Sequence, residues 1–158
     1  MMTERPEITF DLARLDFQRT SDLLKASYWG GQRTDDIHRR AFANSICAIA
    51  LMEGRQVGFA RASGDRATFA RISDVLVWPD HRGRGIGKVL IRALLDHPDM
   101  TSVGTWMLAT SDAHGLYEQF GFRRADSGME MRLDREVGAR QRRSKELTSS
   151  VLVPGAYT

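Results

Sequence analysis

The stretch Val75–Leu94, VLVWPDHRGRGIGKVLIRAL, contains the features that decide the fold. It begins with an apolar segment that ends at Pro79, a residue that cannot donate to a sheet ladder and so marks the exit from a strand. It ends with apolar residues that recur at the spacing of an amphipathic helix. The glycines between these segments, at alternate positions, are Gly83, Gly85 and Gly87. The stretch therefore predicts a strand, a glycine turn and a helix in direct succession.

Such a turn has the properties of an anion site. Unpaired backbone N–H groups and the positive end of the helix dipole meet at one point. Glycines let successive amides face inward without a Cβ that would keep a phosphate away. Arg82, Arg84 and Lys88 add positive charge around the turn. The pattern predicts phosphate binding, and the alternative is a turn whose glycines serve only the local geometry.

Spacing disfavours two classes of phosphate binder. A Walker A loop requires a glycine where this chain has Arg82, and it requires a Ser or Thr that holds magnesium where this chain has Val89. The dinucleotide fingerprint requires its third glycine where this chain has Lys88. Nucleotide hydrolysis and dinucleotide binding are therefore not predicted.

The composition is typical of a single globular domain. Of the 158 residues, 42% are hydrophobic and 27% are charged, and both fractions are ordinary for globular proteins. No apolar run has the length of a membrane span, and the first residues do not resemble a secretion signal. We therefore expect a cytoplasmic protein without membrane contact. The single cysteine, Cys47, lies in an apolar run and is predicted to be a core residue rather than a nucleophile.

Hydrophobic periodicity and capping signals predict strands and helices along the rest of the chain. Asp16 and Thr34 are the expected N-caps of the first two helices, and Gly121 fits a helix C-cap. Strands are expected over 8–15, 46–52, 56–64, 69–78, 103–110 and, as one or two closing strands, 121–133; helices are expected over 17–27, 35–45, 86–97 and 112–120. This order predicts an α/β (α+β) fold with a mixed sheet.

Two motifs carry a family resemblance. RGRGIG, residues 82–87, follows VLVWPDH, and GLYEQFGF, residues 115–122, comes later in the chain. Their order and separation resemble the signatures of the GNAT superfamily of acetyl-CoA-dependent N-acetyltransferases, with Arg82, Gly85 and Gly87 on the pattern R/Q-x-x-G-x-G/A. The resemblance implies a mostly antiparallel sheet of about six to seven strands, splayed at its centre and flanked by about four helices. A single domain is expected over residues 1–135.

The resemblance also implies acetyl-CoA as co-substrate and no metal. The coenzyme A pyrophosphate is expected on the amides of the glycine turn. The pantetheine arm is expected to pair with the preceding strand, where a backbone amide polarises the thioester carbonyl. The expected strand contacts are Val75, Leu76 and Val77. The expected pyrophosphate contacts are Arg82, Gly83, Arg84, Gly85, Ile86, Gly87 and Lys88.

Two further residues take their roles from the resemblance. Tyr117 falls on the tyrosine of the second motif, whose hydroxyl is implied to protonate the departing thiolate. The alternative is that the Tyr117 ring packs in the core against Phe120. Thr110 stands where the family often has an asparagine that contacts the cofactor arm, so a hydroxyl replaces an amide there.

The acceptor amine must lose a proton before it attacks, and several residues are candidates for the base. Asp74 is the first, because a carboxylate inside the apolar ISDVLVW is costly to bury unless it faces a cleft or is paired. An ion pair with Arg61 or Arg71 is the alternative for Asp74. His81 and His114 are candidates by residue type.

The acceptor pocket is expected at the loop SYWGGQRTDD, because aromatic residues beside glycines can line a small-molecule site. Half-buried packing is the alternative for these aromatics. The expected acceptor contacts are Tyr28, Trp29, Arg33 and Trp78, with Phe59 as a further candidate.

These residues predict acetyl transfer from acetyl-CoA to a primary amine of a small molecule, by direct attack in a ternary complex. Two alternatives stay open. One is a coenzyme A-binding sensor or interaction module without turnover, and the other is a protein or peptide N-acetyltransferase.

The C-terminal segment 136–158 is predicted to be a separate basic tail. Its cations are Arg140, Arg142, Arg143 and Lys145. Without interleaved aromatics or a docking element, a solvated tail is favoured over nucleic-acid binding. The segment SSVLVPGAY, residues 149–157, could supply a homodimer contact.

Overall fold

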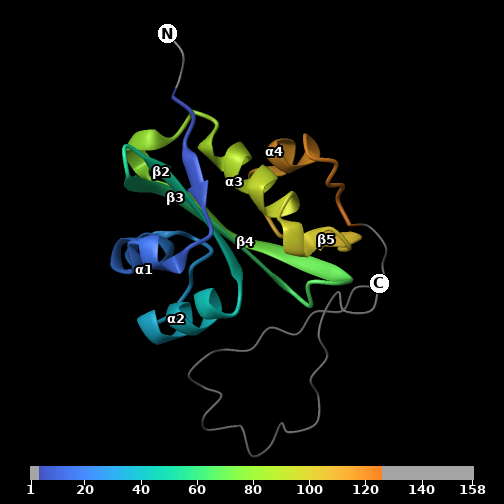
Figure 1. The fold of residues 1–158 in the computed structure, drawn as a ribbon, viewed down its shortest axis with the longest axis horizontal. Coiled ribbons are helices and arrows are strands. Elements are labelled where there is room, and N and C mark those ends of the chain that lie inside the picture. Colours follow the sequence, from blue (N-terminus) through green and yellow to red (C-terminus); the bar gives the residue numbers. More distant parts are fainter. Residues whose placement is uncertain (1–3, 126–158) are drawn as a thin grey trace, which may run out of the picture. The chain divides into compact units, whose positions relative to one another are not determined.

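The computed structural model describes residues 4–125 of the chain (Figure 1). These residues belong to two compact units, the first ending at His114 and the second beginning at Gly115. The first unit contains all the described strands and the helices α1 to α3. The short helix α4 begins at the last residue of the first unit and continues into the second. The predicted basic tail and the 149–157 contact lie outside the described residues.

A mixed, mostly antiparallel sheet runs through the first unit in the order β1-β2-β3-β4-β5. Successive pairs from β1 to β4 are antiparallel, and β5 runs parallel to β4. The strands are β1 Glu7–Thr9, β2 Ile46–Met52, β3 Arg55–Gly64, β4 Phe69–Val77 and β5 Thr105–Met107. The mixed fold is confirmed, and residues 4–125 hold five strands, fewer than the six to seven predicted. Residues 121–125 form no strand, and the rest of the expected closing segment, 126–133, lies outside the described residues.

The predicted helices and their caps are confirmed. The Asp16 side chain accepts a hydrogen bond from the Arg19 amide, and the Thr34 hydroxyl accepts one from the Ile37 amide, as N-caps do. Short 3-10 turns cover 12–14, 79–81 and 98–100. The helices are α1 Phe17–Ala26, α2 Asp35–Ala43, α3 Ile86–Leu95 and α4 His114–Glu118. No helix among residues 4–125 is long and apolar enough to cross a membrane.

The sheet is packed on both faces. On one face, side chains of α1 and α2 join those of β2, β3 and β4 in a core cluster, whose members are Leu24, Phe42, Cys47, Ile49, Leu51, Phe59, Leu76 and Trp78. On the other face α3 comes so close that a Cβ on Gly58 would lie 3.1 Å from Leu90 Cδ1 and 3.2 Å from Ile86 Cγ2. Neighbouring strand residues point to opposite faces, which explains how Gly58 meets α3 while Phe59 meets α2.

Cys47 is a core residue, as predicted. Its side chain is 2% exposed, and its Sγ lies 3.4 Å from the Phe42 carbonyl oxygen. Burial raises the pKa of the Cys47 thiol to about 12. A thiol this far from ionisation is a poor nucleophile.

Candidate active site

The glycine turn has the backbone geometry of an open anion site. Gly83 and Gly85 both have φ of 78°, in the left-handed region that glycine adopts without strain. No heavy atom lies within 4 Å of the position of a Cβ on either residue. Gly85 is the N-cap of α3 and offers no side-chain hydrogen bond, so the first N–H groups of the helix stay open to a ligand.

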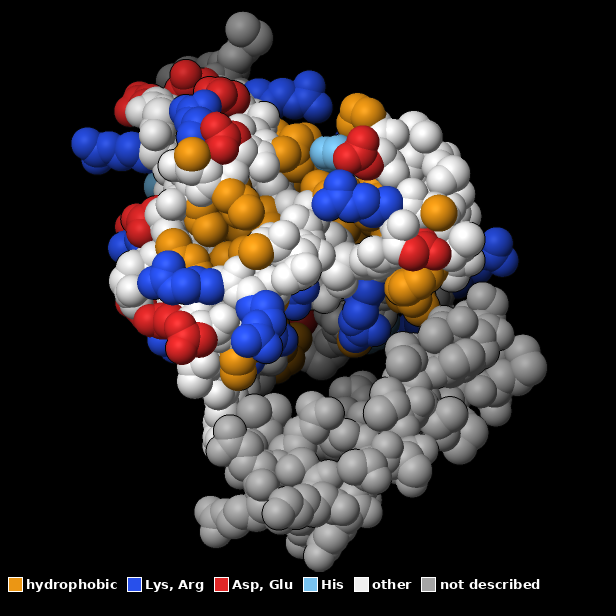
Figure 2. Space-filling view, turned by 60° about the horizontal axis from the view of Figure 1, so that its bottom comes forward, with side chains coloured by type: hydrophobic (Ala, Val, Ile, Leu, Met, Phe, Trp, Pro, Cys, Tyr) orange, Lys and Arg blue, Asp and Glu red, His pale blue; other side chains and the backbone are white. Residues whose placement is uncertain are grey.

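Positive charge surrounds this turn. Arg82, Arg84 and Lys88 are exposed, and Arg82 Nε donates to the Val77 carbonyl oxygen at 3.4 Å. Beside the turn, the His81 ring has a buried Nδ1 without a hydrogen-bond partner in the described part of the chain. Figure 2 shows one face of the molecule, on which Lys and Arg side chains lie beside hydrophobic ones. The turn combines open amides with exposed cations, an environment that suits a phosphate.

The strand that leads to this turn has one open edge. β5 pairs only with Phe69, Ala70 and Arg71 at the start of β4, whereas β4 continues to Val77. Residues 72–77 therefore pair with β3 on one side and with no described strand on the other. An extended ligand can add to such an edge through backbone hydrogen bonds. The expected contacts Val75 and Val77 are half-buried on this segment, and Leu76 packs in the core.

A β-bulge interrupts β4 in this open segment. Leu76 pairs with Phe59 and Ser73 pairs with Arg61, so Asp74 and Val75 together oppose Ala60. Asp74 has φ of 55°, which is uncommon for a residue other than glycine. Bulges re-aim side chains in this way and occur beside active sites. Here the bulge directs the Asp74 carboxylate toward Arg61 on the neighbouring strand β3.

Asp74 is held by two arginines. Arg61 Nε donates to Asp74 Oδ2 at 2.6 Å, and Arg33 Nη1 donates to Oδ1 at 2.8 Å and to Oδ2 at 3.1 Å. Burial of the Asp74 carboxylate would raise its pKa, but its contacts with Arg61 and Arg33 outweigh burial and lower the pKa. The ion pair with Arg61 is confirmed, and the second partner is Arg33 rather than Arg71. A carboxylate with a lowered pKa is a weak base, so the geometry favours the ion-pair alternative.

The loop of residues 27–34 is tied to two places on the first unit. Arg33 links it to β4 through Asp74. The Tyr28 hydroxyl donates to Asp112 Oδ1 at 3.1 Å and accepts from Ser111 Oγ at 2.7 Å. The Tyr28 and Trp29 rings meet edge to face at 5.0 Å, and Tyr28 is 65% exposed. The 27–34 loop therefore bridges the bulge of β4 and the segment that follows β5.

Thr110, an expected cofactor contact, and Trp78, an expected acceptor contact, lie outside the 27–34 loop. Thr110 belongs to the segment after β5, and its Oγ1 accepts a hydrogen bond from the Ala113 amide at 3.0 Å, so its hydroxyl shapes that turn. Trp78 is 6% exposed and belongs to the core cluster, together with Phe59. The guanidinium carbon of Arg19 lies 5.8 Å from the centre of the Trp78 ring. The structure thus brings Tyr28, Trp29 and Arg33 to one loop and places Trp78 beneath the surface.

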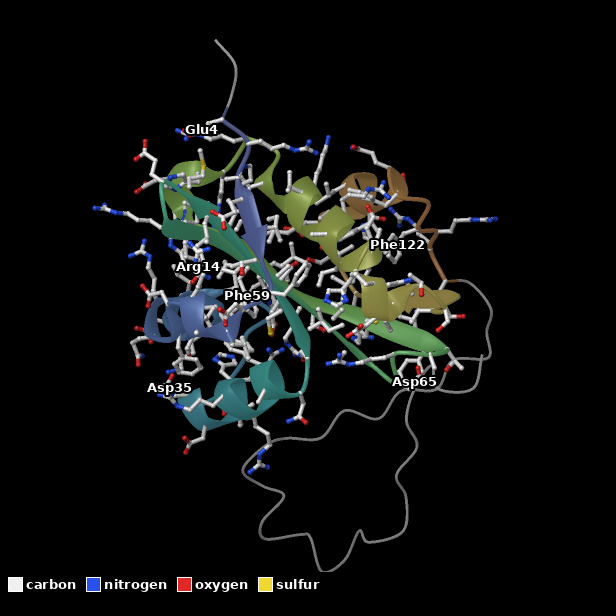
Figure 3. The ribbon with its side chains drawn as sticks, in the orientation of Figure 1. Glu4, Arg14, Asp35, Phe59, Asp65 and Phe122 are labelled. Atoms are coloured by element: carbon white, nitrogen blue, oxygen red, sulfur yellow. The ribbon has the colours of Figure 1, made fainter. Side chains whose placement is uncertain are left out.

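Sequence reasoning missed a polar chain between α1 and α2, in which Ser21 and His38 are buried. Ser21 Oγ lies 2.6 Å from Asp35 Oδ1 and 2.7 Å from His38 Nδ1. Lys25 Nζ forms an ion pair with the same Asp35 oxygen. Figure 3 shows Asp35 at the start of α2. A polar histidine on the apolar side of the predicted 35–45 helix was the only available signal, because the partner serine lies on another helix.

The comparison with known proteins decides the family. The acetyltransferase (GNAT) domain family matches residues 43–124, more than half of the chain. This chain belongs to the GNAT acetyltransferase family. A Xanthomonas campestris pv. campestris structure assigned to the same family is 36% identical, with a TM-score of 0.79, and the match covers 86% of this chain and 96% of that one. The family resemblance and the predicted fold are therefore confirmed.

Curated relatives match over shorter stretches. An uncharacterized N-acetyltransferase of Pyropia yezoensis is 35% identical over 56% of this chain and 55% of its own length. The histone acetyltransferase TAP1 of Glycine max is 38% identical over 48% of this chain and 31% of its own length. The chain thus spans about half or less of the length of these curated relatives.

The residues of this GNAT chain fit coenzyme A, which the family generally uses. The open amides at 83–88 and the nearby cations suit a pyrophosphate, and the open edge of β4 suits an extended amide-containing arm. When bound, acetyl-CoA supplies the activated acetyl group. Among residues 4–125 no group of three His, Cys, Asp or Glu side chains is placed to hold a metal ion.

The second unit of this GNAT chain holds Tyr117. Its ring meets the Phe122 ring edge to face, with the centroids 6.0 Å apart. The Phe120 amide donates to the Tyr117 carbonyl oxygen, and Gly121 ends this turn with φ of 91°, as predicted for a C-cap. The role of Tyr117 as the acid stays a prediction.

Proposed function

We propose that this GNAT chain transfers acetyl from acetyl-CoA to a primary amine of a small molecule, by direct attack in a ternary complex. The observation that carries the proposal is the open edge of β4, residues 72–77, which is followed, after the short 3-10 turn 79–81, by the uncapped glycine turn. An acyl-CoA on this edge would have its pyrophosphate at 83–88 and its thioester beside Val75–Val77. There a backbone amide would polarise the carbonyl.

Direct attack is favoured over a covalent acetyl-enzyme. Cys47 is the only cysteine in the chain, and its burial and raised pKa argue against a nucleophilic role. The amine itself would therefore attack the thioester carbon. The proposed acid for the departing thiolate is Tyr117, by resemblance to the family motif.

A small acceptor is favoured by the 27–34 loop. The contacts of Tyr28 with Ser111 and Asp112, and of Arg33 with Asp74, hold this loop across the first unit. A loop held in place by these contacts favours compact acceptors over a long peptide. The Tyr28 and Trp29 rings offer aromatic contact area for such an acceptor. The name of the Glycine max relative favours a protein acceptor as the second candidate.

We also expect a cytoplasmic location.

One experiment separates these functions. Calorimetry measures coenzyme A binding, and a free-thiol assay follows acetyl-CoA with tyramine, spermidine, glucosamine or a lysine-containing peptide. We expect binding and thiol release with at least one small amine. Release with the peptide alone would favour protein acetylation, and binding without any release would favour a sensor. Absence of coenzyme A binding would overturn the sensor and both enzyme proposals.

A further inference from the structure

One buried titratable group has no role in the proposed function. His38 on α2 is 0% exposed, and its Nε2 has no hydrogen-bond partner among residues 4–125. Buried polar atoms in folded proteins nearly always have a partner, so an orphaned one needs an explanation. A donor that arrives with water or a ligand would provide it.

The hydrogen bonds of Ser21 decide which ring nitrogen of His38 carries the proton. The Asp35 carboxylate can only accept, and its contacts with Lys25 and Ser21 lower its pKa to about 2, so it is ionised at neutral pH. The Ser21 hydroxyl proton therefore goes to Asp35, and Ser21 Oγ accepts from His38 Nδ1–H. The lone pair of the neutral ring is then at Nε2.

His38 lies next to the bulge of β4. Arg33, just before α2, binds Asp74, while Phe42, near the end of α2, packs on Phe59 with ring centroids 4.7 Å apart. His38 lies between these two contact points and stacks on Phe42 at 5.5 Å with 7° between the ring planes. Figure 3 shows Phe59 on the sheet near its centre. The ring is thus on the same side of the sheet as the Asp74 carboxylate.

Charged groups on each neighbouring element act on this ring. Burial is the largest effect and lowers the pKa of His38, and Arg33, Lys25 and Arg61 lower it further, whereas Asp74 raises it. Asp35 is the remaining charge, reached through Ser21. The imidazole is therefore neutral at pH 7 and able to take up a proton.

We propose that His38 is the general base of the reaction and accepts, through Nε2 and one bridging water, a proton from the acceptor ammonium. This inference rests on the proposed function. It gives Ser21 and Asp35 a role as positioning residues that fix the tautomer of the ring. Asp74, occupied by two arginines, would then organise the site rather than take the proton.

The proton and electron pairs balance in this scheme. The ammonium gives one proton through the water to Nε2, and the freed nitrogen lone pair forms the C–N bond with the thioester carbon. The C–S bond then breaks with its electron pair on sulfur. The thiolate receives its proton from Tyr117, the proposed acid, and Tyr117 recovers the proton that the new amide nitrogen loses. The imidazolium releases its proton to solvent. The products are the amide, the thiol and one proton.

The test is a pH profile of kcat/KM with the amine of the panel that is acetylated fastest. His38→Asn keeps a side-chain donor near Ser21 and removes Nε2. We expect kcat to fall by about 10²- to 10⁴-fold, the acidic limb of the profile to disappear, and coenzyme A affinity by calorimetry to stay unchanged. An unchanged acidic limb in a folded His38→Asn variant would overturn the proposal.

Two measurements do not depend on that variant folding. Nitrogen NMR of the histidine-labelled native chain at neutral pH should show His38 protonated at Nδ1, and protonation at Nε2 would overturn the proposal. Ser21→Ala should shift the acidic limb, and an unshifted limb would contradict the positioning role. If no amine is acetylated by the native chain, the proposed function fails, whereas turnover with a normal His38→Asn profile overturns only this inference.

Discussion

The glycine turn and the surroundings of Asp74 belong to the same strand end, yet they are built differently. The turn uses the backbone of one continuous segment, residues 83–88, with two glycines at φ of 78°. The Asp74 site uses side chains from three segments, and Arg33 and Asp74 are 41 positions apart in the chain. A backbone site requires particular residues at adjacent positions, whereas a side-chain network requires the complete fold. The two regions should therefore respond differently to substitution.

The largest expected effect is on stability, at Asp74. Asp74→Asn removes the buried carboxylate shared by Arg33 and Arg61 and should lower the free energy of unfolding by about 3 kcal/mol, because the partly buried guanidinium groups lose their partner. Urea denaturation measures this change. Asp99→Asn is the matched control: its ion pair with Arg66 is exposed, and its loss should cost about 1 kcal/mol or less. Equal effects of the two substitutions would contradict the structural role of Asp74.

The same variant sharpens the question of the base. If Asp74 organises the site, the acidic limb of the turnover profile should stay in Asp74→Asn even though the rate falls. Loss of that limb would return Asp74 to the role of proton acceptor.

A substitution in the glycine turn should act mainly on binding, and its effect on stability should be limited to the cost of a positive φ, about 1–2 kcal/mol. Gly85→Asp brings a carboxylate and a strained φ to the proposed pyrophosphate site, and we expect coenzyme A affinity to fall by about 100-fold, or about 2.7 kcal/mol. Gly54→Asp is the matched control, because Gly54 has φ of 74° and open space around its Cβ position but lies in the β2–β3 hairpin. Equal affinity in both variants, measured by calorimetry, would contradict the proposed site.

A smaller effect is expected where the 27–34 loop meets the segment after β5. Tyr28→Phe keeps the ring beside Trp29 and removes the hydrogen bonds to Ser111 and Asp112, each worth about 1 kcal/mol. We expect the KM for the amine to rise by about tenfold, with coenzyme A affinity unchanged. A fall in coenzyme A affinity of the same size would show that this loop serves the cofactor side.

The smallest effect is the pH dependence of stability that His38 causes. The pKa of His38 in the folded chain lies below the ordinary value of 6.5. The neutral ring therefore makes its full contribution to the free energy of unfolding when the pH is above 6.5. As pH falls below it, the unfolded chain takes up a proton that the folded chain resists. Unfolding free energy should therefore decrease between about pH 7.5 and about pH 5.5, and His38→Asn should reduce this slope. Asp74 does not interfere in this range, because its stabilising contribution is lost only as pH falls below its ordinary value of 3.8.

Local signals predicted much of the fold. The N-caps Asp16 and Thr34, the β2–β3 hairpin and the entry into α3 all follow from residues near each other in the chain. The expected strand over 103–110 was longer than β5, because apolar alternation does not reveal where a neighbouring strand stops pairing. The burial of Trp78 was also not predictable, because the register of the strand pairing decides which face of the sheet a side chain occupies.

The sequence by itself determined the glycine turn, its cations and the family, because these depend on residue types at adjacent positions and on two local motifs. Only the tertiary structure decided that Arg33 rather than Arg71 joins Arg61 on Asp74, and that Ser21 and Asp35 hold His38. The bulge in β4 turns Asp74 toward its partners, and helix packing brings α1 and α2 together. These contacts join residues from different elements, and only the packing of the whole chain brings such residues within hydrogen-bond distance.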